Sequence, residues 1–484
     1  MSALWLALHL PRLPLEILQR GLDAAHFAAN DVTPLPLAVV AGGSTSRILL
    51  PDADAVRLGI APGMSLSAAY ALAPDLVVRT RELALEAETL DGLALWAEQF
   101  TPTLSLASPD TLLLEIGGCL RLFSGLETLL DRVRIGLTDL GFDACLACAP
   151  TPEGAHLLAR NGLEDRVVQI EPLRRRLAQL PVEGLDLSPE HATAFSRLGL
   201  HTLGDCLRLP RDGLARRFGQ AVVDRFDRAL GHRPDPRAPF IPPPRFTTRL
   251  VLPAPVPEVE RLLFGAQRLL LELAGFLAGR QAGVTRFALT LEHEDVPVTR
   301  VPVELSMPSR DPAHLVLLAR ERLSRTGLPA PVEAIRLDCE EAMQLAPRNF
   351  SFFPTEEAAA EDRVTLVERL RSRLGRDAVH GLTLVPAHRP ELAFREAEPG
   401  TSPPGIPPSP RPLWLLHLPR PVSPQSLRLL SGPERIESGW WDGNDVQRDY
   451  FVALQVNHAK CWVYRERTDV DAASERWFVH GYFA

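Results

Sequence analysis

Two proline-rich stretches constrain the fold of this chain of 484 residues more than any other feature of its sequence. The first runs from Pro234 to Pro244, and the second runs from Glu398 to Pro412. Because proline fixes φ and has no backbone N–H, such stretches form stiff, extended connections and neither helices nor inner strands. They predict a multidomain protein, and the length suffices for about three domains of roughly 150 residues.

The chain before the first linker shows two patterns. Residues 1–168 alternate apolar runs of strand length with helical periodicity, which predicts an α/β unit. Its strands are expected at 4–10, 36–40, 47–50, 103–107, 111–116 and 144–149, and its helices at 15–27, 53–59, 85–100, 120–140 and 154–161. A further helix follows Ser65, the predicted N-cap. Residues 169–233 predict short helices interrupted by proline and glycine.

The chain after the first linker predicts a second α+β unit. Over 245–345 the order is strand, long helix (257–280), two strands, helix (312–326) and strand (334–339). Residues 346–412 are expected to be a tether, and residues 413–484 hold five of the seven tryptophans. This last region predicts short β-strands with turns at Gly432-Pro433 and Asp442-Gly443. The predicted fold class is therefore α+β and multidomain, with a β-rich C-terminal region.

Six cysteines and the start of the chain bear on the compartment. Cys145 and Cys148 form a CxxC, which is typical of redox and zinc sites, but no second ligand pair follows at zinc spacing. We expect them to be small buried residues of a reducing compartment. No apolar run of about 20 residues predicts a membrane span, and Met1 to Trp5 lack a signal-peptide pattern. The expected location is the cytoplasm.

The charge is distributed unevenly along the chain. The net charge of −8 argues against a generic nucleic-acid binder, but residues 166–245 carry 14 Arg against 9 acidic residues. This stretch contains the candidate phosphate contacts Arg174, Arg175, Arg176, Arg208, Arg211, Arg216 and Arg217. The alternative is a solvated helix face whose arginines pair with acids of the same chain. Lys460 is the single lysine, so no lysine serves as a phosphate ligand before it.

Three segments resemble the Y-family translesion DNA polymerases. Residues 53–76 are similar to that family's fingers motif around Gly59 and Gly63-Met64, and 108–115 to its palm hairpin. Residues 198–205 and 209–219 are similar to its thumb pattern. The resemblance covers roughly residues 1–345, and it implies palm and fingers at 1–168, a helical thumb at 169–233 and a little finger at 245–345.

The same resemblance indicates that the catalytic site is lost. Phosphoryl transfer by two Mg²⁺ ions needs a cluster of carboxylates. The family's metal-binding positions correspond here to Pro11, Asp110 and Thr111, so Asp110 alone remains as a vestige, and the second aspartate of the first motif corresponds to Leu13. The triphosphate-gripping side chains correspond to Ala53 and Val56, and the sugar gate to Leu15 or Glu16. We expect no catalysis, no metal and no cofactor.

A short segment after the second α+β unit predicts a sliding-clamp ligand. Asn349, Phe350, Ser351, Phe352 and Phe353 follow the spacing of bacterial clamp-binding peptides, which place an amide and bulky apolar residues into a pocket. Three exposed phenylalanines are otherwise costly in water. The alternative is that they pack back onto the preceding domain.

The C-terminal part is similar to ImuB-type proteins, on residues 366–391, 430–450 and 477–484. Within that family the resemblance implies a non-catalytic DNA-repair scaffold of damage-induced mutagenesis and the SOS response. Its implied partners are damaged primer-template DNA, the sliding clamp, an ImuA-like (RecA-like) protein and an error-prone C-family DNA polymerase. Residues 413–484 are the implied partner-binding region.

Two other classes of function stay open on the sequence alone. The chain is an active Y-family polymerase if Asp110, Glu115 and Glu16 hold a metal in a different arrangement. It is a pure protein-interaction hub if the arginines of residues 166–245 contact no DNA.

Overall fold

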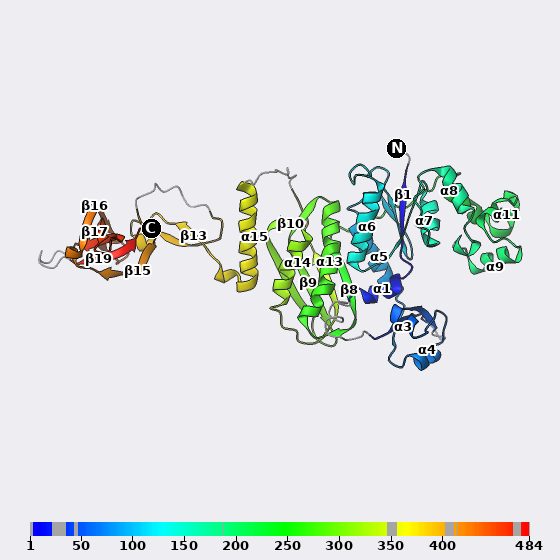
Figure 1. The fold of residues 1–484 in the computed structure, drawn as a ribbon, viewed down its shortest axis with the longest axis horizontal. Coiled ribbons are helices and arrows are strands. Elements are labelled where there is room, and N and C mark those ends of the chain that lie inside the picture. Colours follow the sequence, from blue (N-terminus) through cyan, green and yellow to red (C-terminus); the bar gives the residue numbers. More distant parts are fainter. Residues whose placement is uncertain are drawn as a thin grey trace. The chain divides into compact units, whose positions relative to one another are not determined.

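The computed structural model of the protein describes residues 3–21, 35–42, 47–185, 187–345, 356–401, 411–412, 414–467 and 476–483 (Figure 1). The chain divides into two units, Met1–Ser372 and Arg373–Ala484. Asp186 and the clamp-ligand residues 349–353 lie outside the described residues.

A four-stranded antiparallel sheet forms the centre of the palm-like part of the first unit. Its order is β5 (Leu104–Ala107), β6 (Thr111–Glu115), β1 (Trp5–His9) and β7 (Cys145–Ala149). Because side chains alternate across a strand, Leu6 and Leu8 of β1 face one layer and Ala7 faces the other. Both layers are apolar, which explains why β1 is a continuous apolar run.

Helices cover both faces of this palm-like sheet. The helices α5 (Leu83–Ala97) and α6 (Leu126–Leu140) contribute to the core that contains Leu6 and Leu8. The helix α7 (Pro152–Arg160) covers the opposite face, where Ala7 lies. The short helix α1 (Leu13–Gln19) follows β1 directly.

A small three-stranded sheet with two short helices forms the fingers-like part. The strand β2 (Leu37–Val40) pairs with β3 (Ile48–Pro51) antiparallel and with β4 (Val77–Thr80) parallel. The helices are α3 (Ala53–Arg57) and α4 (Leu66–Leu72). The Ser65 hydroxyl accepts from the Ala68 N–H, so the predicted N-cap is confirmed.

Short helices form the thumb-like segment, residues 169–233, as the pattern predicted. They are α8 (Ile170–Leu177), the 3₁₀ turn Val182–Leu185, α9 (Pro189–Arg197), α10 (Leu203–Leu207), α11 (Arg211–Phe218) and α12 (Gln220–Ala229). A reciprocal capping box of Thr202 and Asp205 begins α10. This segment shares its apolar core with α7 of the palm-like part.

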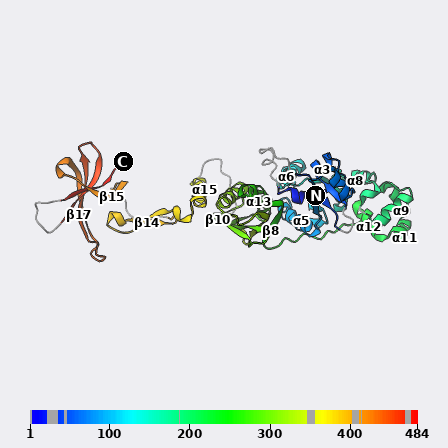
Figure 2. The same ribbon diagram turned by 90° about the horizontal axis from the view of Figure 1, so that it is seen from below.

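The little-finger-like body, residues 246–345, is a sheet with two helices on one face, which Figure 2 shows from below. The sheet order is β10 (Thr299–Ser309), β9 (Ala282–His293), β11 (Val332–Cys339) and β8 (Phe246–Val256), and β12 (Met343–Gln344) also pairs with β9. The helices are α13 (Val259–Gly279) and α14 (Pro312–Leu323). The helix α15 (Glu356–Leu374) follows, and Glu368 accepts hydrogen bonds from His314 and from the Ser306 N–H.

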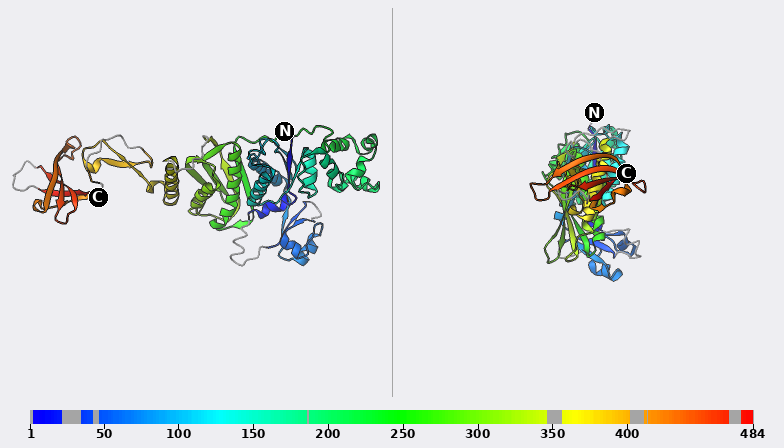
Figure 3. Two further views of the ribbon diagram at one scale, coloured as in Figure 1. Left: turned by 45° about the horizontal axis from the view of Figure 1, so that its top comes forward. Right: turned by 90° about the vertical axis from the view of Figure 1, so that its left-hand side faces the viewer.

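A five-stranded antiparallel sheet dominates the second unit (Figure 3). Its order is β15 (Trp414–Pro421), β19 (Trp477–Tyr482), β18 (Lys460–Glu466), β17 (Val446–Gln455) and β16 (Leu427–Ser438). A separate hairpin consists of β13 (Gly381–Leu384) and β14 (Phe394–Ala397). One apolar cluster lies around Val463 and another around Trp462, on opposite faces of β18.

Several local predictions were wrong. The helix expected from Leu120 begins only at Leu126, because Ser124 and Gly125 adopt positive φ. Gly432-Pro433 is not a turn: it interrupts the register inside β16, whose 12 residues contradict the expected short strands. The range 346–412, expected to be a tether, contains α15 and the β13–β14 hairpin. The turn at Asp442-Gly443, between β16 and β17, is confirmed.

The expectation of no apolar stretch of membrane-spanning length also needs correction. Among the described residues α13 is long and apolar enough to cross a membrane by length and composition. Its buried side chains include Leu262, Leu269 and Leu273, which lie in the core of the little-finger-like body.

Candidate functional site

The vestigial carboxylate, Asp110, lies at the edge of the palm-like sheet where β1 ends and β6 begins. Asp110 immediately precedes β6, and His9 is the last residue of β1. His9 pairs with Thr111 in the antiparallel register, which brings residues 102 positions apart into contact. The Thr111 hydroxyl donates to the Asp110 carboxylate at 3.0 Å, and its oxygen lies 3.0 Å from His9 Nδ1. Thr111 therefore occupies its position as a hydrogen-bond bridge.

The charge of Asp110 is engaged by groups of the protein itself. His9 Nδ1 lies 3.3 Å from Asp110 Oδ1, and an Arg160 nitrogen lies 3.9 Å from Oδ2. Burial acts to raise the pKa of Asp110, but the hydrogen bonds from His9 and Thr111 and the charge of Arg160 leave the pKa lowered. Asp110 is therefore ionised at neutral pH, with the Thr111 hydroxyl and the Arg160 guanidinium of the same chain beside it.

The other two carboxylates of the alternative metal site lie elsewhere. Glu115 is at the far end of β6, opposite Trp5, and accepts from the backbone N–H groups of Leu4 and Gly117. Burial raises the pKa of Glu16 to about 7, and its Oε2 has no hydrogen-bond partner among the described residues. Among the described residues no three His, Cys, Asp or Glu side chains gather as a metal site. The structure does not bring the three together.

The positions that correspond to the family's first metal-binding motif and to its nucleotide grip carry side chains with structural environments. Leu13 and Leu15 are fully buried, and Leu15 packs with Leu37 and Val39 of the fingers-like sheet. Pro11 and Val56 are exposed and offer no polar group. Thr151, after β7, caps α7 through the Gly154 N–H and donates to the Ala229 carbonyl of the thumb-like segment.

The candidate arginines of the thumb-like segment fall into two groups. Four have carboxylate partners within the chain: Arg174 with Glu171, Arg176 with Asp165, Arg208 with Asp205 and Arg211 with Asp227. Arg175, Arg216 and Arg217 are exposed and form no ion pair within the described part of the chain. Only this second group presents cations that are not already neutralised, so it is the stronger candidate for phosphate contacts.

A row of arginines that the sequence reading missed crosses the open face of the little-finger-like sheet. Arg300, Thr290, Arg336 and Arg249 lie opposite one another on the four adjacent strands. Arg249 pairs with Glu292 and Arg336 with Asp338. The period of two along β8, β10 and β11 places each arginine opposite the helix-covered face. The sequence shows this alternation of arginines along each strand. It does not show which strands pair, and that pairing is what aligns the arginines into a row.

The first linker is anchored by an ionic cluster that the sequence reading also missed. Glu153 of α7 binds Arg225 of α12 and Arg237 of the linker, and Arg237 also binds Asp235. Although burial opposes it, hydrogen bonds and charges from His156 and Arg225 hold the pKa of Glu153 at about 2. The proline-rich linker is therefore attached to the palm-like part.

The CxxC does not converge on one site. Cys145 and Cys148 are three positions apart on β7, so they point to opposite faces of the sheet. Burial raises their pKa values to about 11 and about 12. Both are therefore thiols at neutral pH, which disfavours metal binding or redox exchange through a thiolate.

Exposed tryptophans gather in the second unit. Trp440 and Trp441, at the turn between β16 and β17, have 78% and 61% of their surface exposed. Their rings meet edge to face at 5.5 Å, and the Arg389 guanidinium lies 5.8 Å from the Trp441 ring. Arg389 is held in place by Asp442 and the Asn444 carbonyl. In contrast Trp462 and Trp477 are buried in the sheet, as expected for core residues.

Comparison with known proteins places this architecture. Residues 25–160 match the sequence model of the impB/mucB/samB family. A DNA polymerase IV from Shewanella oneidensis is 26% identical over 213 residues, which cover 40% of this chain and 56% of that protein. The resemblance to Y-family polymerases is thereby confirmed.

A second relative matches over a longer part of the chain. The Protein ImuB of Caulobacter vibrioides is 28% identical over 457 residues, which cover 88% of this chain and all of that protein. The chain is thus similar to an ImuB protein over most of its length, in line with the resemblance of its C-terminal motifs. Among solved structures, DinB from Sulfolobus solfataricus and a Dbh DNA polymerase ternary complex are both 16% identical, with TM-scores of 0.37 and 0.39. Each alignment covers 71% of this chain and 100% of the solved chain.

Proposed function

We propose that the protein is a non-catalytic scaffold of DNA damage tolerance, which binds DNA with a polymerase-like body without extending a primer. The observation that carries this proposal is the environment of Asp110. A single carboxylate, which accepts a hydrogen bond from Thr111 and lies next to His9 and Arg160, lacks the additional ligands that two Mg²⁺ ions require. The ImuB-type resemblance over most of the chain supports the same role, and a cytoplasmic location accords with it.

A primer-extension assay tests the absence of catalysis. The full-length protein is incubated with a labelled primer-template, the four deoxynucleotides and either Mg²⁺ or Mn²⁺, beside an active Y-family polymerase. We expect no extension, while fluorescence anisotropy on the same sample records binding of the duplex. Template-dependent incorporation would show that an atypical metal site is active and would refute the proposal.

DNA binding is proposed for the thumb-like segment and the open face of the little-finger-like sheet. Arg175, Arg216 and Arg217 offer unpaired cations on the first surface, and Arg300 offers one on the second within the described residues. Phosphate contacts make affinity fall steeply with salt. A salt-independent or undetectable affinity for primer-template DNA would favour the alternative of a pure protein-interaction hub.

Sliding-clamp binding is proposed for residues 349–353, on the spacing of Asn349, Phe350 and Phe352-Phe353. The test is a calorimetric titration of the chain with the clamp of the same organism. Changing Phe352 and Phe353 to Ala is expected to abolish binding, whereas Thr355→Ala, two residues beyond the segment, is the matched control. Unchanged affinity of the double variant would exclude this segment as the ligand.

The second unit is proposed to bind the ImuA-like protein or the error-prone C-family polymerase. Trp440 and Trp441 support this, because exposed adjacent aromatic side chains are costly in water and typical of binding hot spots. A pull-down from damaged cells with Trp440→Ala/Trp441→Ala tests the assignment. Trp414→Ala, another exposed tryptophan on β15, serves as the control for a general loss of aromatic surface.

A further inference from the structure

The long helix of the little-finger-like body has two buried faces. One face of α13 packs on its own sheet, and another packs on α5 and α6 of the palm-like part. Leu95 of α5 is a member of the little-finger-like core, and Leu271 of α13 packs against the palm-like core. The two cores therefore meet across this helix, which also accounts for its apolar composition along 21 residues.

Glycines set the close approach of these helices. Gly275 and Gly279 lie four residues apart on α13 and hence on one face. A Cβ at Gly275 would lie 2.5 Å from Trp96 Cδ1, and a Cβ at Gly279 would lie 2.8 Å from the Glu98 backbone. Gly136 of α6 meets the other edge of the Trp96 indole. We name Gly136, Gly275, Gly279 and Trp96 the glycine notch.

A buried ion pair fixes the register of the same contact. Arg20, at the end of α1, binds Glu272 of α13, and their side chains are only 3% and 2% exposed. The Thr248 hydroxyl donates to the second Glu272 oxygen at 2.5 Å, and Arg268 donates to the Arg20 carbonyl. A buried charge without its partner is strongly unfavourable. Any docked register other than this one would leave Arg20 or Glu272 buried and unpaired.

The linker between the two parts follows the palm-like surface as well. Arg237 is ion-paired to Glu153, and the Phe240 N–H donates to the Leu104 carbonyl of β5 at 2.8 Å. The Phe240 ring packs against both cores. A linker held by its charge, its backbone and its ring is not free to act as a hinge.

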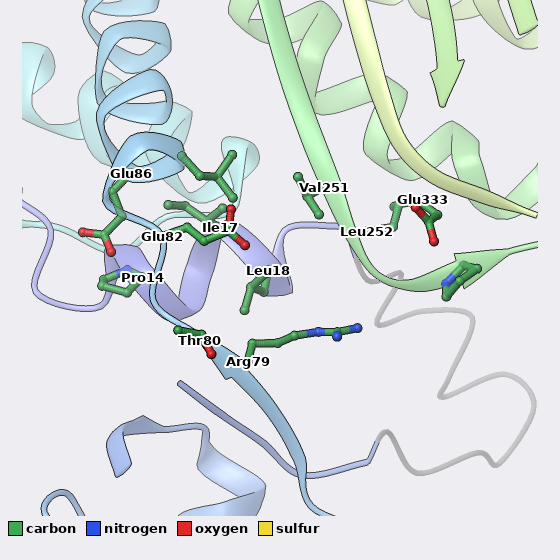
Figure 4. Close-up of a pocket in the computed structure, with 12 residues that line it drawn as sticks. Pro14, Ile17, Leu18, Arg79, Thr80, Glu82, Glu86, Val251, Leu252 and Glu333 are labelled. Carbon is green, nitrogen blue, oxygen red and sulfur yellow. The ribbon is translucent and has the colours of Figure 1, made fainter. Parts of the chain in front are cut away.

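The fingers-like sheet also reaches the little-finger-like body. An Arg79 nitrogen donates to the Pro253 carbonyl of β8 at 2.6 Å. Figure 4 shows Arg79 extending toward β8 beside a cavity of about 250 Å³, which α1, β4, α5 and β8 surround. The palm-like and fingers-like parts therefore both contact the little-finger-like body, through Arg20 and through Arg79.

We infer that the palm-like part and the little-finger-like body form one locked body that does not open when DNA binds. The ion pair of Arg20 and Glu272 sets the position of α13 against the palm-like part. The glycine notch and the anchored linker hold the two parts together. DNA then binds a preformed surface, and any conformational change on binding occurs outside these two parts. The locked body rests on packing alone, whereas its response to DNA rests on the proposed DNA binding, which fluorescence anisotropy on the same sample records separately.

Pulsed electron-spin resonance between two labels tests the lock. Thr128→Cys on α6 and Ser324→Cys after α14 are exposed label sites, in a full-length background with Cys119→Ser and Cys145→Ser. We expect one narrow distance distribution that is the same with and without a primer-template duplex. Two populations in the free protein, or a shift on adding DNA, would overturn the inference.

Variants then identify what holds the two parts together. Glu272→Gln keeps the shape but removes the charge, and Gly275→Leu drives a side chain into Trp96; each is expected to broaden the distance distribution. Gly327→Leu, where a Cβ meets nothing within 4 Å, is the control that leaves it narrow. Hydrogen exchange of β9 and β11 checks that the little-finger-like core stays folded. A narrow distribution in both test variants would exclude the ion pair and the notch as the lock.

Discussion

The salt dependence of DNA binding provides a quantitative test of the thumb-like segment. Arg175, Arg216 and Arg217 have no ion pair within the described residues, so replacing all three by Ala removes three full cations. Each phosphate contact contributes about 0.9 to the slope of log affinity against log salt. If all three contact phosphates, the slope therefore falls by about 2.7. Between about 50 and about 200 mM salt, that difference corresponds to roughly 40-fold in affinity.

The matched control is the triple variant Arg174→Ala, Arg176→Ala and Arg211→Ala. These arginines lie in the same segment but pair with Glu171, Asp165 and Asp227. Their removal takes away the same number of charges, but each of these guanidinium groups already binds a carboxylate of the chain and is not expected to contact a phosphate, so the salt slope should change less. Fluorescence anisotropy with a primer-template duplex over a salt series gives both slopes. An equal reduction of slope in the two variants would refute the division into free and paired arginines.

Three further predictions concern the palm-like part. Asp110→Asn keeps the acceptor for Thr111, so the free energy of unfolding in urea should fall by only about 1 kcal/mol, with DNA affinity unchanged. The pKa of Glu153 is about 2 in the folded protein against 4.5 in the unfolded chain, so its ionised form stabilises the fold by about 3 kcal/mol above pH 4.5. This contribution is lost as the pH falls toward 2. Glu153→Gln should therefore make the free energy of unfolding less dependent on pH in acid-unfolding curves. Leu6→Ala, fully buried in β1, should cost about 2–5 kcal/mol in the same urea assay.

Local patterns were sufficient to predict much of the secondary structure. The run Leu4–Leu10 is apolar because both faces of β1 are covered, and Ser65 signals a helix start through a side chain that bonds three residues ahead. The α+β class and the β-rich C-terminal region also followed from pattern, and the structure confirms them. These features depend on residues that are neighbours in the sequence.

The contacts that define the site and the lock depend on residues far apart. His9 meets Thr111 across 102 residues, and Arg20 meets Glu272 across 252, so neither spacing marks the pair. Gly275 and Gly279 are weak helix formers when considered alone. Their value lies in the close approach of Trp96, which becomes visible only when α5 and α13 are placed together.

The same short segment of chain joins the altered palm site to the lock. β1 ends at His9, which lies next to Asp110, and Arg20, which directly follows α1, binds Glu272. A polymerase that extends a primer must shift along the duplex after each addition. A body whose parts share a core and a buried ion pair repositions only by separating that core. The lock is therefore compatible with a protein that binds DNA but extends no primer. The packing of α13 and the proposed loss of catalysis at Asp110 thus point to the same role.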